Sequence, residues 1–255
     1  MEYDDSLLDL DYLVFSSHKT ATQSVADTLR INQFRCVHCH TLIDIGLRDG
    51  GFKSFLDGHR HKHKTKLVII NTFREPIERR ISSFFQWHAD GVVRVREVKD
   101  LTETIIYKFS IQELQERLID EMDHEATELA KQADESTAHI CRELDISVDS
   151  LTYNPQIRYG VHETDRCKIF LFRFDILTKM LSGLLSTITE TPIAEHRSNI
   201  SADKWYADIY TEFIESLRLD HNAIKHVYEC KRDLINLFYP NEYGSLLTTT
   251  LKKYG

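Results

Sequence analysis

Three apolar, strand-like runs, each followed by a helical pattern, restrict the fold of this chain more than any other feature. The runs are Tyr12–Phe15, Lys66–Asn71 and Lys168–Phe174. The second is rich in β-branched residues and has no alternating polar positions, as expected when both faces of a strand are buried. Strands that alternate with helices form a parallel sheet with helices packed on its faces. The sequence therefore predicts an α/β fold with a central parallel sheet.

Each run leads into a helix signal. After the first run, Val25 and Leu29 lie four residues apart, on one face of a helix. After the second, Pro76 occupies a position that is favoured for a first helical residue, and apolar residues follow it at helical spacing. The third run leads into a helix that we expect over residues 175–188. These three strand–turn–helix units define the predicted core.

The remaining segments predict helical additions to this core. Residues 111–143 predict one or two long surface helices, inserted between the second and third units. Their apolar stripe consists of Ile111, Leu114, Leu118 and Met122. Two closing helices are expected over 205–217 and 223–238. The 255 residues contain nine glycines, four prolines and no linker or repeat. We therefore expect a single domain over 1–255, with a helix-rich insertion at about 90–165 and C-terminal helices.

The charge and the composition argue against several functions. The formal net charge is −8, whereas general nucleic-acid binding needs a surplus of Lys and Arg on one face, so we expect no nucleic-acid partner. No apolar run reaches the length of a membrane span. The segment Met1–Asp11 is acidic, unlike a signal peptide. The five cysteines, an odd number, predict reduced thiols in a cytoplasmic protein.

The loop after the first strand has the composition of an anion site. It contains Lys19, followed by Thr20, Thr22 and Ser24. A loop between a buried strand and a helix N-terminus presents free N–H groups and the positive end of the helix dipole to a ligand. A phosphate or sulfate would suit this place. The same residues also fit a simple helix cap with a solvated Lys19.

The nucleotide-triphosphate loop G-x-x-x-x-G-K-[ST] is absent from the sequence. No glycine occurs between Met1 and Ile45. A kinase or ATPase of that class would lack its phosphate cradle here. A nucleotide or small-molecule kinase is the second hypothesis, and the missing loop argues against it. A kinase would bind ATP in preference to other nucleotides, which would distinguish it from the alternatives.

Residues 15–24, FSSHKTATQS, and residues 72–85, TFREPIERRISSFF, are similar to two motifs of one family, the sulfotransferases that use 3′-phosphoadenosine 5′-phosphosulfate (PAPS). The first segment resembles the 5′-phosphosulfate loop, which is commonly P-K-T-G-T-T or P-K-T-A-S-T. The second segment resembles the 3′-phosphate motif. In that motif an Arg ends a strand and a Ser follows eight residues later, and Arg74 and Ser82 have this spacing. The two motifs occur in the expected order.

Weaker similarities extend over most of the chain. Residues 172–177, FRFDIL, resemble a strand that ends in R-[FY]-[ED]-x-L. Residues 197–206 and 238–242 resemble segments of bacterial capsular-polysaccharide sulfotransferases. The insertion is covered least, and within it the segment Leu151–Gly160 is expected to face the acceptor.

The resemblance implies a fold, an activity and a set of residues. The fold would be a P-loop-like three-layer sandwich. The activity would be transfer of the sulfuryl group of PAPS to a hydroxyl of a carbohydrate or polysaccharide, with PAP as product and no metal. Lys19 would contact the 5′-phosphosulfate and its bridging oxygen, and Arg74 and Ser82 would hold the 3′-phosphate. The cofactor-binding residues implied are His18, Lys19, Thr20, Ala21, Thr22, Gln23, Ser24, Arg74 and Ser82. A non-catalytic protein that binds PAPS or PAP is the third hypothesis.

Two loop residues depart from the family pattern. His18 stands where proline is usual, and Ala21 stands where glycine is common. Because Ala21 has a Cβ, we expect its φ to be negative.

The acceptor hydroxyl needs a general base, and histidine has a suitable pKa of about 6.5. Residues 36–42, CVHCHTL, follow the first helix and are expected to form the second strand or its end. His38 and His40 lie two residues apart, so they share a face of an extended segment. Uronyl-type carbohydrate sulfotransferases also carry an H-x-H pair between the two phosphate motifs. We prefer His40 as the base, with His38 second and Lys19 as the catalytic cation. One histidine of the pair also fits a hydrogen-bonded core position.

Two further groups of residues, a cysteine pair and a basic run, are interpreted without a functional role. Cys36-x-x-Cys39 with the two histidines resembles a zinc or redox site, but no second ligand pair follows nearby, so we expect no metal. Residues 59–64, HRHKHK, are expected to be a solvated basic loop before a strand.

Overall fold

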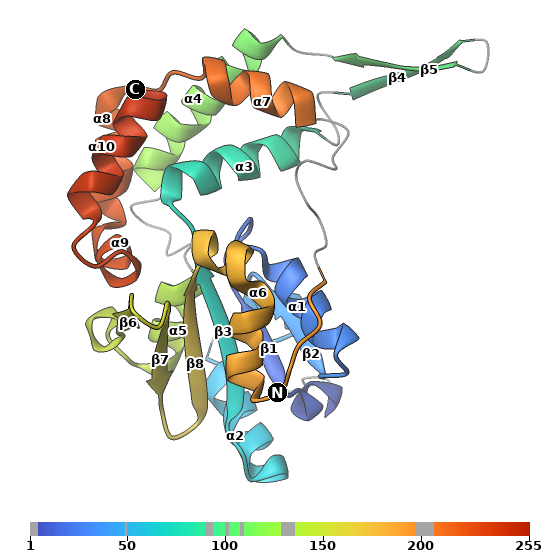
Figure 1. Cartoon of the computed structure of the whole chain (residues 1–255), viewed down its shortest axis with the longest axis vertical. Coiled ribbons are helices and arrows are strands. Elements are labelled where there is room, and N and C mark those ends of the chain that lie inside the picture. The colour runs from blue at the N-terminus through green and yellow to red at the C-terminus, as the bar shows by residue number, and fades with distance from the viewer. Residues whose placement is uncertain are drawn as a thin grey trace. The chain divides into compact units, whose positions relative to one another are not determined.

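The structure, a computed structural model, describes residues 5–48, 50–89, 94–99, 102–107, 110–128, 136–196 and 207–255 (Figure 1). The chain divides into two compact units. The first unit comprises Met1–Glu75, Ala133–Asn199 and Arg232–Tyr243, and the second comprises Pro76–Gln132, Ile200–Lys231 and Gly244–Gly255. The insertion expected at about 90–165 is thus divided between the units.

The first unit is built on a six-stranded sheet with the strand order β2-β1-β3-β8-β7-β6. Neighbouring strands from β2 to β8 are parallel, whereas β7 and β6 are antiparallel to their neighbours. The strands are β1 Tyr12–Phe15, β2 Cys36–Cys39, β3 Leu67–Phe73, β6 Tyr153–Asn154, β7 Tyr159–Glu163 and β8 Cys167–Arg173. The predicted α/β fold is confirmed, and the central sheet is mostly parallel.

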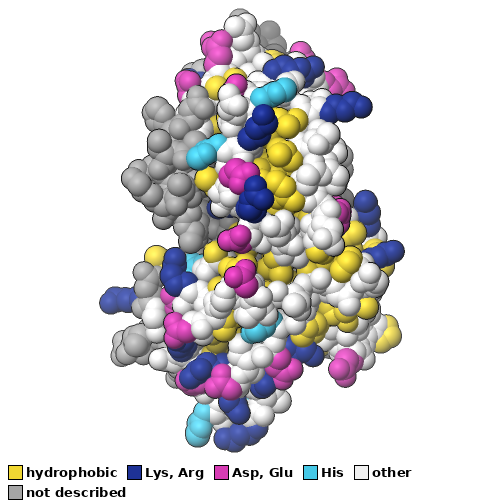
Figure 2. All heavy atoms as spheres, turned by 90° about the vertical axis from the view of Figure 1, so that its left-hand side faces the viewer, with side chains coloured by type: hydrophobic (Ala, Val, Ile, Leu, Met, Phe, Trp, Pro, Cys, Tyr) yellow, Lys and Arg dark blue, Asp and Glu magenta, His cyan; other side chains and the backbone are white. Residues whose placement is uncertain are grey.

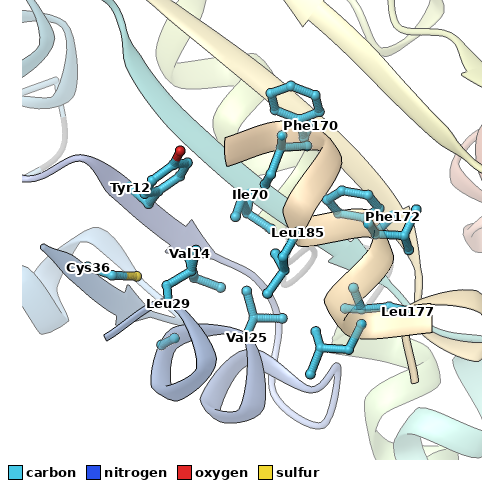
Figure 3. Close-up of a cluster of buried hydrophobic side chains, with 14 of the residues drawn as sticks. Tyr12, Val14, Val25, Leu29, Cys36, Ile70, Phe170, Phe172, Leu177 and Leu185 are labelled. Atoms are coloured by element: carbon cyan, nitrogen blue, oxygen red, sulfur yellow. The ribbon is translucent and has the colours of Figure 1, made fainter. Parts of the chain in front are cut away.

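Helices cover both faces of this sheet. Val14 of β1 belongs to a buried cluster with Val25 of α1 and Leu185 of α6 (Figure 3). The next residue, Phe15, points to the other face, where its ring lies 6.2 Å from Phe52 of α2 and 5.4 Å from His139 of α5. The unit therefore has three layers, because successive strand residues face opposite sides.

The helices of the first unit are short to medium in length. They are η1 Asp5–Asp9, α1 Thr22–Ile31, η2 Leu42–Ile45, α2 Phe52–His63, α5 Ser136–Leu144, η3 Val148–Ser150, α6 Phe174–Thr189 and α9 Arg232–Phe238. Each of the three predicted strand–helix units is present in the structure, with boundaries that agree with the prediction or differ by one or two residues.

The second unit is mainly helical. Its elements are α3 Pro76–Ala89, β4 Arg94–Lys99, β5 Thr102–Tyr107, α4 Ile111–Glu128, α7 Ala207–Ser216, α8 His221–Cys230 and α10 Tyr243–Tyr254. Phe213 packs against Phe84 and Phe85, with ring centroids 6.0 and 4.7 Å apart. Leu114 and Leu118 of the predicted stripe are buried. The stripe therefore supplies core, as its spacing predicted.

Acidic and basic side chains are interspersed on the face shown in Figure 2. In the second unit, for example, Lys253 pairs with Glu78 at 2.9 Å and Arg80 pairs with Glu121 at 2.9 Å. Among the residues that the structure describes, none of the helices is long and apolar enough to cross a membrane.

Several segments differ from the sequence prediction. The expected helix over 223–238 is divided at Lys231 into α8 and α9, and α10 was not anticipated. The insertion is not purely helical, because it supplies the β4–β5 ribbon and the strands β6 and β7. Leu151–Gly160 contributes to the β6–β7 hairpin, and its contact with an acceptor stays a prediction. At Gly160 a Cβ would collide with the carbonyl oxygen of Thr152, so the hairpin requires glycine there.

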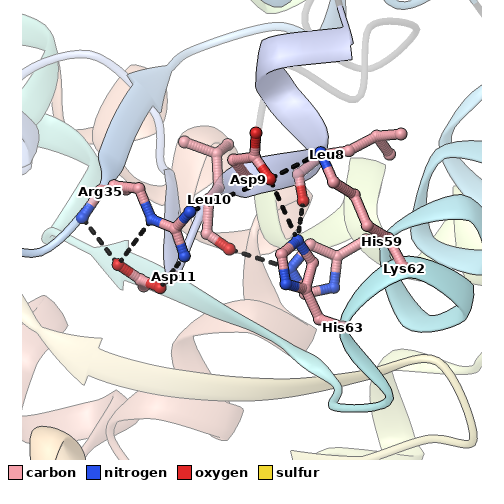
Figure 4. A network of polar contacts seen from close by, with 8 residues as sticks. All are labelled: Leu8, Asp9, Leu10, Asp11, Arg35, His59, Lys62 and His63. Carbon is pink, nitrogen blue, oxygen red and sulfur yellow. Dashed lines mark hydrogen bonds and ion pairs between the residues drawn. The ribbon is translucent and has the colours of Figure 1, made fainter.

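The histidine-rich run at 59–64 ends helix α2 and is not the predicted loop. His59 is 3% exposed, and its Nε2 lies 2.9 Å from Leu10 O. His63 Nε2 lies 2.6 Å from Leu8 O (Figure 4). The sequence did not predict this helix, because its apolar residues are few and basic residues follow them. The buried face consists of Phe52, Phe55, Leu56 and His59.

A buried hydrogen-bond network fixes the carboxyl end of β1. The amide of Asn71 donates to Phe15 O at 2.8 Å and to Ser136 Oγ at 2.8 Å, and it accepts from Thr137 Oγ1 at 2.6 Å. Ser16 Oγ accepts the backbone N–H of Thr72 at 2.8 Å. β1, β3 and the start of α5 are thereby joined through side chains.

We predict that Asn71→Ala lowers the free energy of unfolding by about 3 kcal/mol, because it leaves Phe15 O and two hydroxyls without their buried partner. The control is Asn222→Ala at an exposed position, which should change the free energy by less than about 0.5 kcal/mol. Urea unfolding measures both. Equal effects of the two substitutions would contradict the structural role of the network.

Candidate active site

The candidate site lies where the strand order of the sheet reverses. β1 continues through α1 to β2 on one side, whereas β3 lies on the other side of β1. Open α/β sheets bind ligands outside the carboxyl ends of their strands at such a point. The loop after β1 contains Lys19, and Arg74 directly follows β3. The topology therefore brings the two predicted motifs to one edge of the sheet.

The loop after β1, residues 16–21, is called the anion loop below. Lys19 has φ 65° and Ala21 has φ 63°, so both are left-handed. They alternate with His18 and Thr20, which are not left-handed. Left-handed residues that alternate with right-handed ones can turn successive N–H groups toward one side, which is a backbone form that binds anions. The loop leads directly into the N-terminus of α1, whose dipole adds positive potential.

The prediction that Ala21 has a negative φ is wrong. A left-handed alanine costs about 1–2 kcal/mol, so its surroundings must hold it. Thr20 Oγ1 donates to Ser17 O at 2.6 Å. Ser17 N donates to Ser136 Oγ at 2.9 Å, and Ser17 Oγ accepts from Ser136 N at 3.1 Å. These buried hydrogen bonds hold the loop in a conformation that its φ angles alone would disfavour.

The predicted hydroxyl and amide donors have local partners in the structure. Thr20 and Thr22 are buried, and their hydroxyl oxygens are 3.3 Å apart. Gln23 donates to Asp27 at 2.6 Å. Ser24 is half-buried in the first turn of α1. Thr20 therefore shapes the loop, and cofactor contacts by these side chains stay predictions.

Arg74 joins the two motifs. Its Nη1 donates to Lys19 O at 3.2 Å, and its guanidinium lies 4.3 Å from the centroid of the Phe174 ring. A cation over an aromatic face is stabilised by the ring quadrupole. Its Nε is buried without a hydrogen-bond partner among the described residues. Phe174 was missed as a site residue, although it lies in the R-[FY]-[ED]-x-L match.

Ser82 lies on α3 and is 7% exposed. It belongs to the second unit, whereas Arg74 belongs to the first. Their joint contact with a 3′-phosphate stays a prediction from their spacing. The similarity over residues 197–206 lies outside the described residues.

His40 is held at the carboxyl end of β2. Its Nδ1 lies 2.7 Å from Ser16 O, and its backbone N–H donates to Asp44 Oδ2 at 2.8 Å. Because a carbonyl oxygen only accepts, Nδ1 must carry the proton. In the neutral ring this leaves the lone pair on Nε2. The ring of His18 packs against His40, with centroids 3.7 Å apart.

His38 lies on β2 beside His40, as the two-residue spacing predicted. Their ring centroids are 5.9 Å apart. Burial lowers the pKa of His38, and the positive charge of Arg30 adds to this effect. Its Nδ1 is buried without a partner among the described residues. His38 is thus poised as a neutral ring, and the catalytic role of either histidine stays a prediction.

The cysteines of the C-x-x-C pair are buried and free. Burial raises the pKa of Cys36 to about 12 and also raises that of Cys39. Cys36 packs in the cluster between β1 and α1. Within the described residues, no group of three His, Cys, Asp or Glu side chains could hold a metal ion. Protonated, buried thiols are poor nucleophiles and poor ligands.

Arg173 lies at the carboxyl end of β8, at the same edge of the sheet as Arg74. It pairs with Asp175 at 2.8 Å and with Glu242 at 2.8 Å, and its guanidinium lies 4.0 Å from the Tyr239 ring centroid. The matches at 172–177 and 238–242 are therefore in contact in the structure. Their residues bind one another across the end of β8.

Comparisons with models of protein families, with characterised proteins and with solved structures find no match to this chain. The chemistry must be argued from the site itself. The first unit combines a loop with left-handed residues at a helix N-terminus, the cationic residues Lys19 and Arg74, and an imidazole whose Nε2 has a lone pair when the ring is neutral. This combination suits transfer of an anionic group to a hydroxyl.

The left-handed backbone at Ala21 gives a test of the loop. We predict that Ala21→Gly raises the free energy of unfolding by about 1 kcal/mol, because glycine adopts positive φ without steric cost. The matched control, Ala26→Gly in the middle of α1, should lower it by at least about 1 kcal/mol. Denaturant unfolding of both variants measures the difference, and a loss of stability in Ala21→Gly would contradict the loop conformation.

Proposed function

We propose that this protein is a PAPS-dependent sulfotransferase that transfers a sulfuryl group to a hydroxyl of a carbohydrate. The observation that carries the proposal is the bond from Arg74 to Lys19 O, between the loop after β3 and the anion loop. This bond holds the two motif-like segments together at the edge of the sheet, which supports a shared binding site for their cations. A ligand with two phosphate groups suits this arrangement. We also propose that the α/β sandwich is of the P-loop-like class.

Each residue of the site has a role in the proposed reaction. When bound, PAPS supplies the sulfuryl group and a phosphate leaving group, so no metal is required. The ammonium of Lys19 and the N–H groups of the anion loop stabilise the charge that develops on the leaving oxygen. Arg74 holds the 3′-phosphate with a guanidinium, which binds phosphate in a bidentate way.

His40 is the proposed base. Its Nδ1 donates to Ser16 O, which fixes the ring and directs the Nε2 lone pair to the acceptor's proton. His38 is the second candidate, and burial lowers its pKa, which favours a neutral ring. His59 and His63 are bound to backbone oxygens that precede β1, at the other end of the strand. They are therefore poor substitutes for His40.

The carbohydrate acceptor and the cytoplasmic location rest on the sequence. The H-x-H pair and the resemblance support a glycan acceptor, and the five free thiols fit a reducing compartment. A kinase is supported less well, because the loop has no glycine. A protein that only binds PAPS or PAP would not need a fixed imidazole beside the loop.

Cofactor binding is tested by thermal stability. PAP at a concentration of about 100 times its Kd should stabilise the protein by about 2.7 kcal/mol. Adenosine 5′-phosphosulfate and ATP should raise Tm less at equal concentration. Arg74→Lys should reduce the effect of PAP and leave that of adenosine 5′-phosphosulfate nearly unchanged. Equal increases in Tm with PAPS and with adenosine 5′-phosphosulfate would contradict the proposed 3′-phosphate site.

The base is tested by single-turnover transfer from ³⁵S-labelled PAPS to a panel of glycans. His40→Gln should lower the transfer rate by about 10²–10⁴-fold, as loss of a general base does. PAP affinity should stay the same, because the base contacts the acceptor. His38→Gln is the control and should lower the rate much less. A normal rate in His40→Gln with a slow His38→Gln would reverse the two roles.

A further inference from the structure

Two histidines of α2 bind the short segment that leads into β1 (Figure 4). Nε2 of His59 lies 2.9 Å from Leu10 O, and Nε2 of His63 lies 2.6 Å from Leu8 O. The side chain of Leu10 is buried as well. Residues 8–11 are called the latch segment below. Their position on α2 depends on contacts with side chains that are 49 and 55 residues away in the chain.

A second proton on His59 would have no acceptor. A carbonyl oxygen only accepts, so in the neutral ring Nε2 carries the proton and Nδ1 has the lone pair. The second proton must therefore enter at Nδ1. His59 is 3% exposed, and its Nδ1 is buried without a hydrogen-bond partner among the described residues. A charged His59 would thus place an unpaired N–H group and a positive charge in the interior.

His63 makes the same kind of bond in different surroundings. Its side chain is 25% exposed, and its Nε2 also lies 3.4 Å from a carboxylate oxygen of Asp9. Lys62 binds the same carboxylate at 2.6 Å, and this hydrogen bond lowers the pKa of Asp9. Asp9 is therefore ionised near neutral pH and can balance a charge on His63. Of the two rings, only His59 has a buried nitrogen that lacks a partner among the described residues.

The charged and titratable groups around His59 come from several elements. They are Asp9 from η1, Asp11 before β1, Arg35 before β2, and Lys62 and His63 from α2. Asp11 attracts a proton to His59, whereas His63 and Arg35 repel it. Although burial opposes it, hydrogen bonds from Arg35 hold the pKa of Asp11 below its usual value. The carboxylates of Asp9 and Asp11 therefore keep their charge between pH 7 and pH 5.

Other charged groups near α2 contact different parts of the helix or of the sheet. They are Glu143 at the N–H of Gly50, Asp145 at Lys53, Arg166 at Asp57, and His139, whose ring packs on Phe15 at the carboxyl end of β1. None of these printed contacts involves the latch segment. The latch segment and α2 themselves therefore supply the response to acid.

We propose that His59 is the acid-sensitive part of a latch, which holds residues 8–11 on α2 near neutral pH and releases them as the pH falls. Burial lowers the pKa of His59, although its bond to Leu10 O acts in the opposite direction. The stability that the bound ring contributes is therefore full above the pKa of a free histidine, about 6.5, and is lost as the pH falls below it. The proposal is independent of the proposed sulfotransferase activity.

The state of the ring is tested first. Nitrogen-15 NMR of the full chain measures the tautomer and the pH titration of each histidine. At pH 7, His59 should be neutral with its proton on Nε2, and its titration midpoint should lie below the value of a free histidine, about 6.5. A midpoint at or above that value, or a neutral ring with its proton on Nδ1, overturns the proposal.

Release of the segment is measured by hydrogen exchange. The N–H of Asp11 donates to Arg35 O at 2.8 Å, and the N–H of Arg35 donates to Asp11 Oδ2 at 2.8 Å. Both amides lose these bonds when the latch segment leaves. From pH 7 to pH 5 their protection factors, corrected for intrinsic exchange, should fall by about threefold or more. The protection factor of Ile69 in β3 should change by less than about twofold.

The role of His59 is tested by His59→Gln, with His63→Gln as the matched control. A glutamine amide can donate to the same carbonyl oxygen but does not titrate between pH 5 and pH 7. The acid-dependent loss of protection should disappear in His59→Gln and persist in His63→Gln. Each variant is compared with itself at two pH values, so a general change in stability does not imitate the effect. If His59→Gln does not fold, the wild-type titration and exchange still decide.

Each outcome supports or overturns the latch. Acid-dependent loss of protection at Asp11 and Arg35 alone, removed by His59→Gln, supports it. A loss that Ile69 shares indicates acid unfolding of the whole unit and overturns it. Constant protection of the wild-type protein from pH 7 to pH 5 overturns it as well. So does loss of the pH effect in His63→Gln, because the sensitive ring would then not be His59 alone.

Discussion

The buried hydrogen bonds at the carboxyl end of β1 are the constraint on which the site depends. Asn71 satisfies Phe15 O and Ser136 Oγ, and Ser16 Oγ receives the N–H of Thr72. In a low-dielectric interior, each of these groups would be costly to leave unpaired. The chain therefore leaves β1 in one direction, and the anion loop begins from a rigid point.

The same short segment organises both halves of the proposed chemistry. Ser16 O fixes the imidazole of His40, and Ser17 ties the loop to the start of α5. Lys19 and Ala21 keep their left-handed conformations because these contacts hold the backbone of the loop in place. Residues 16 and 17 therefore fix both the ring of the proposed base and the start of the proposed anion loop.

Strands β1, β3 and β8 and the helices that follow them were predictable because their signals are local. Apolar runs such as Lys66–Asn71 predict buried strands, and Pro76 marks a helix start. Helix α2 was not predicted, because the run of His59 and its basic neighbours is typical of a solvated loop, although His59 is buried. The hairpin of β6 and β7 was not predicted either. β7 pairs with β8, and two-residue β6 is defined by its pairing with β7 and not by its own pattern.

The sequence by itself determined that Lys19 follows the first strand, that Arg74 lies at the end of the second strand–turn–helix unit's strand, and that the H-x-H pair forms a further strand or its end. Only the tertiary structure decided how these groups meet. Ala21 is left-handed because of bonds to Ser136, which is 119 residues from Ser17 in the chain. His18 lies on His40 because β1 and β2 are parallel neighbours. Periodicity reports local burial, whereas contacts between distant residues depend on how the layers pack.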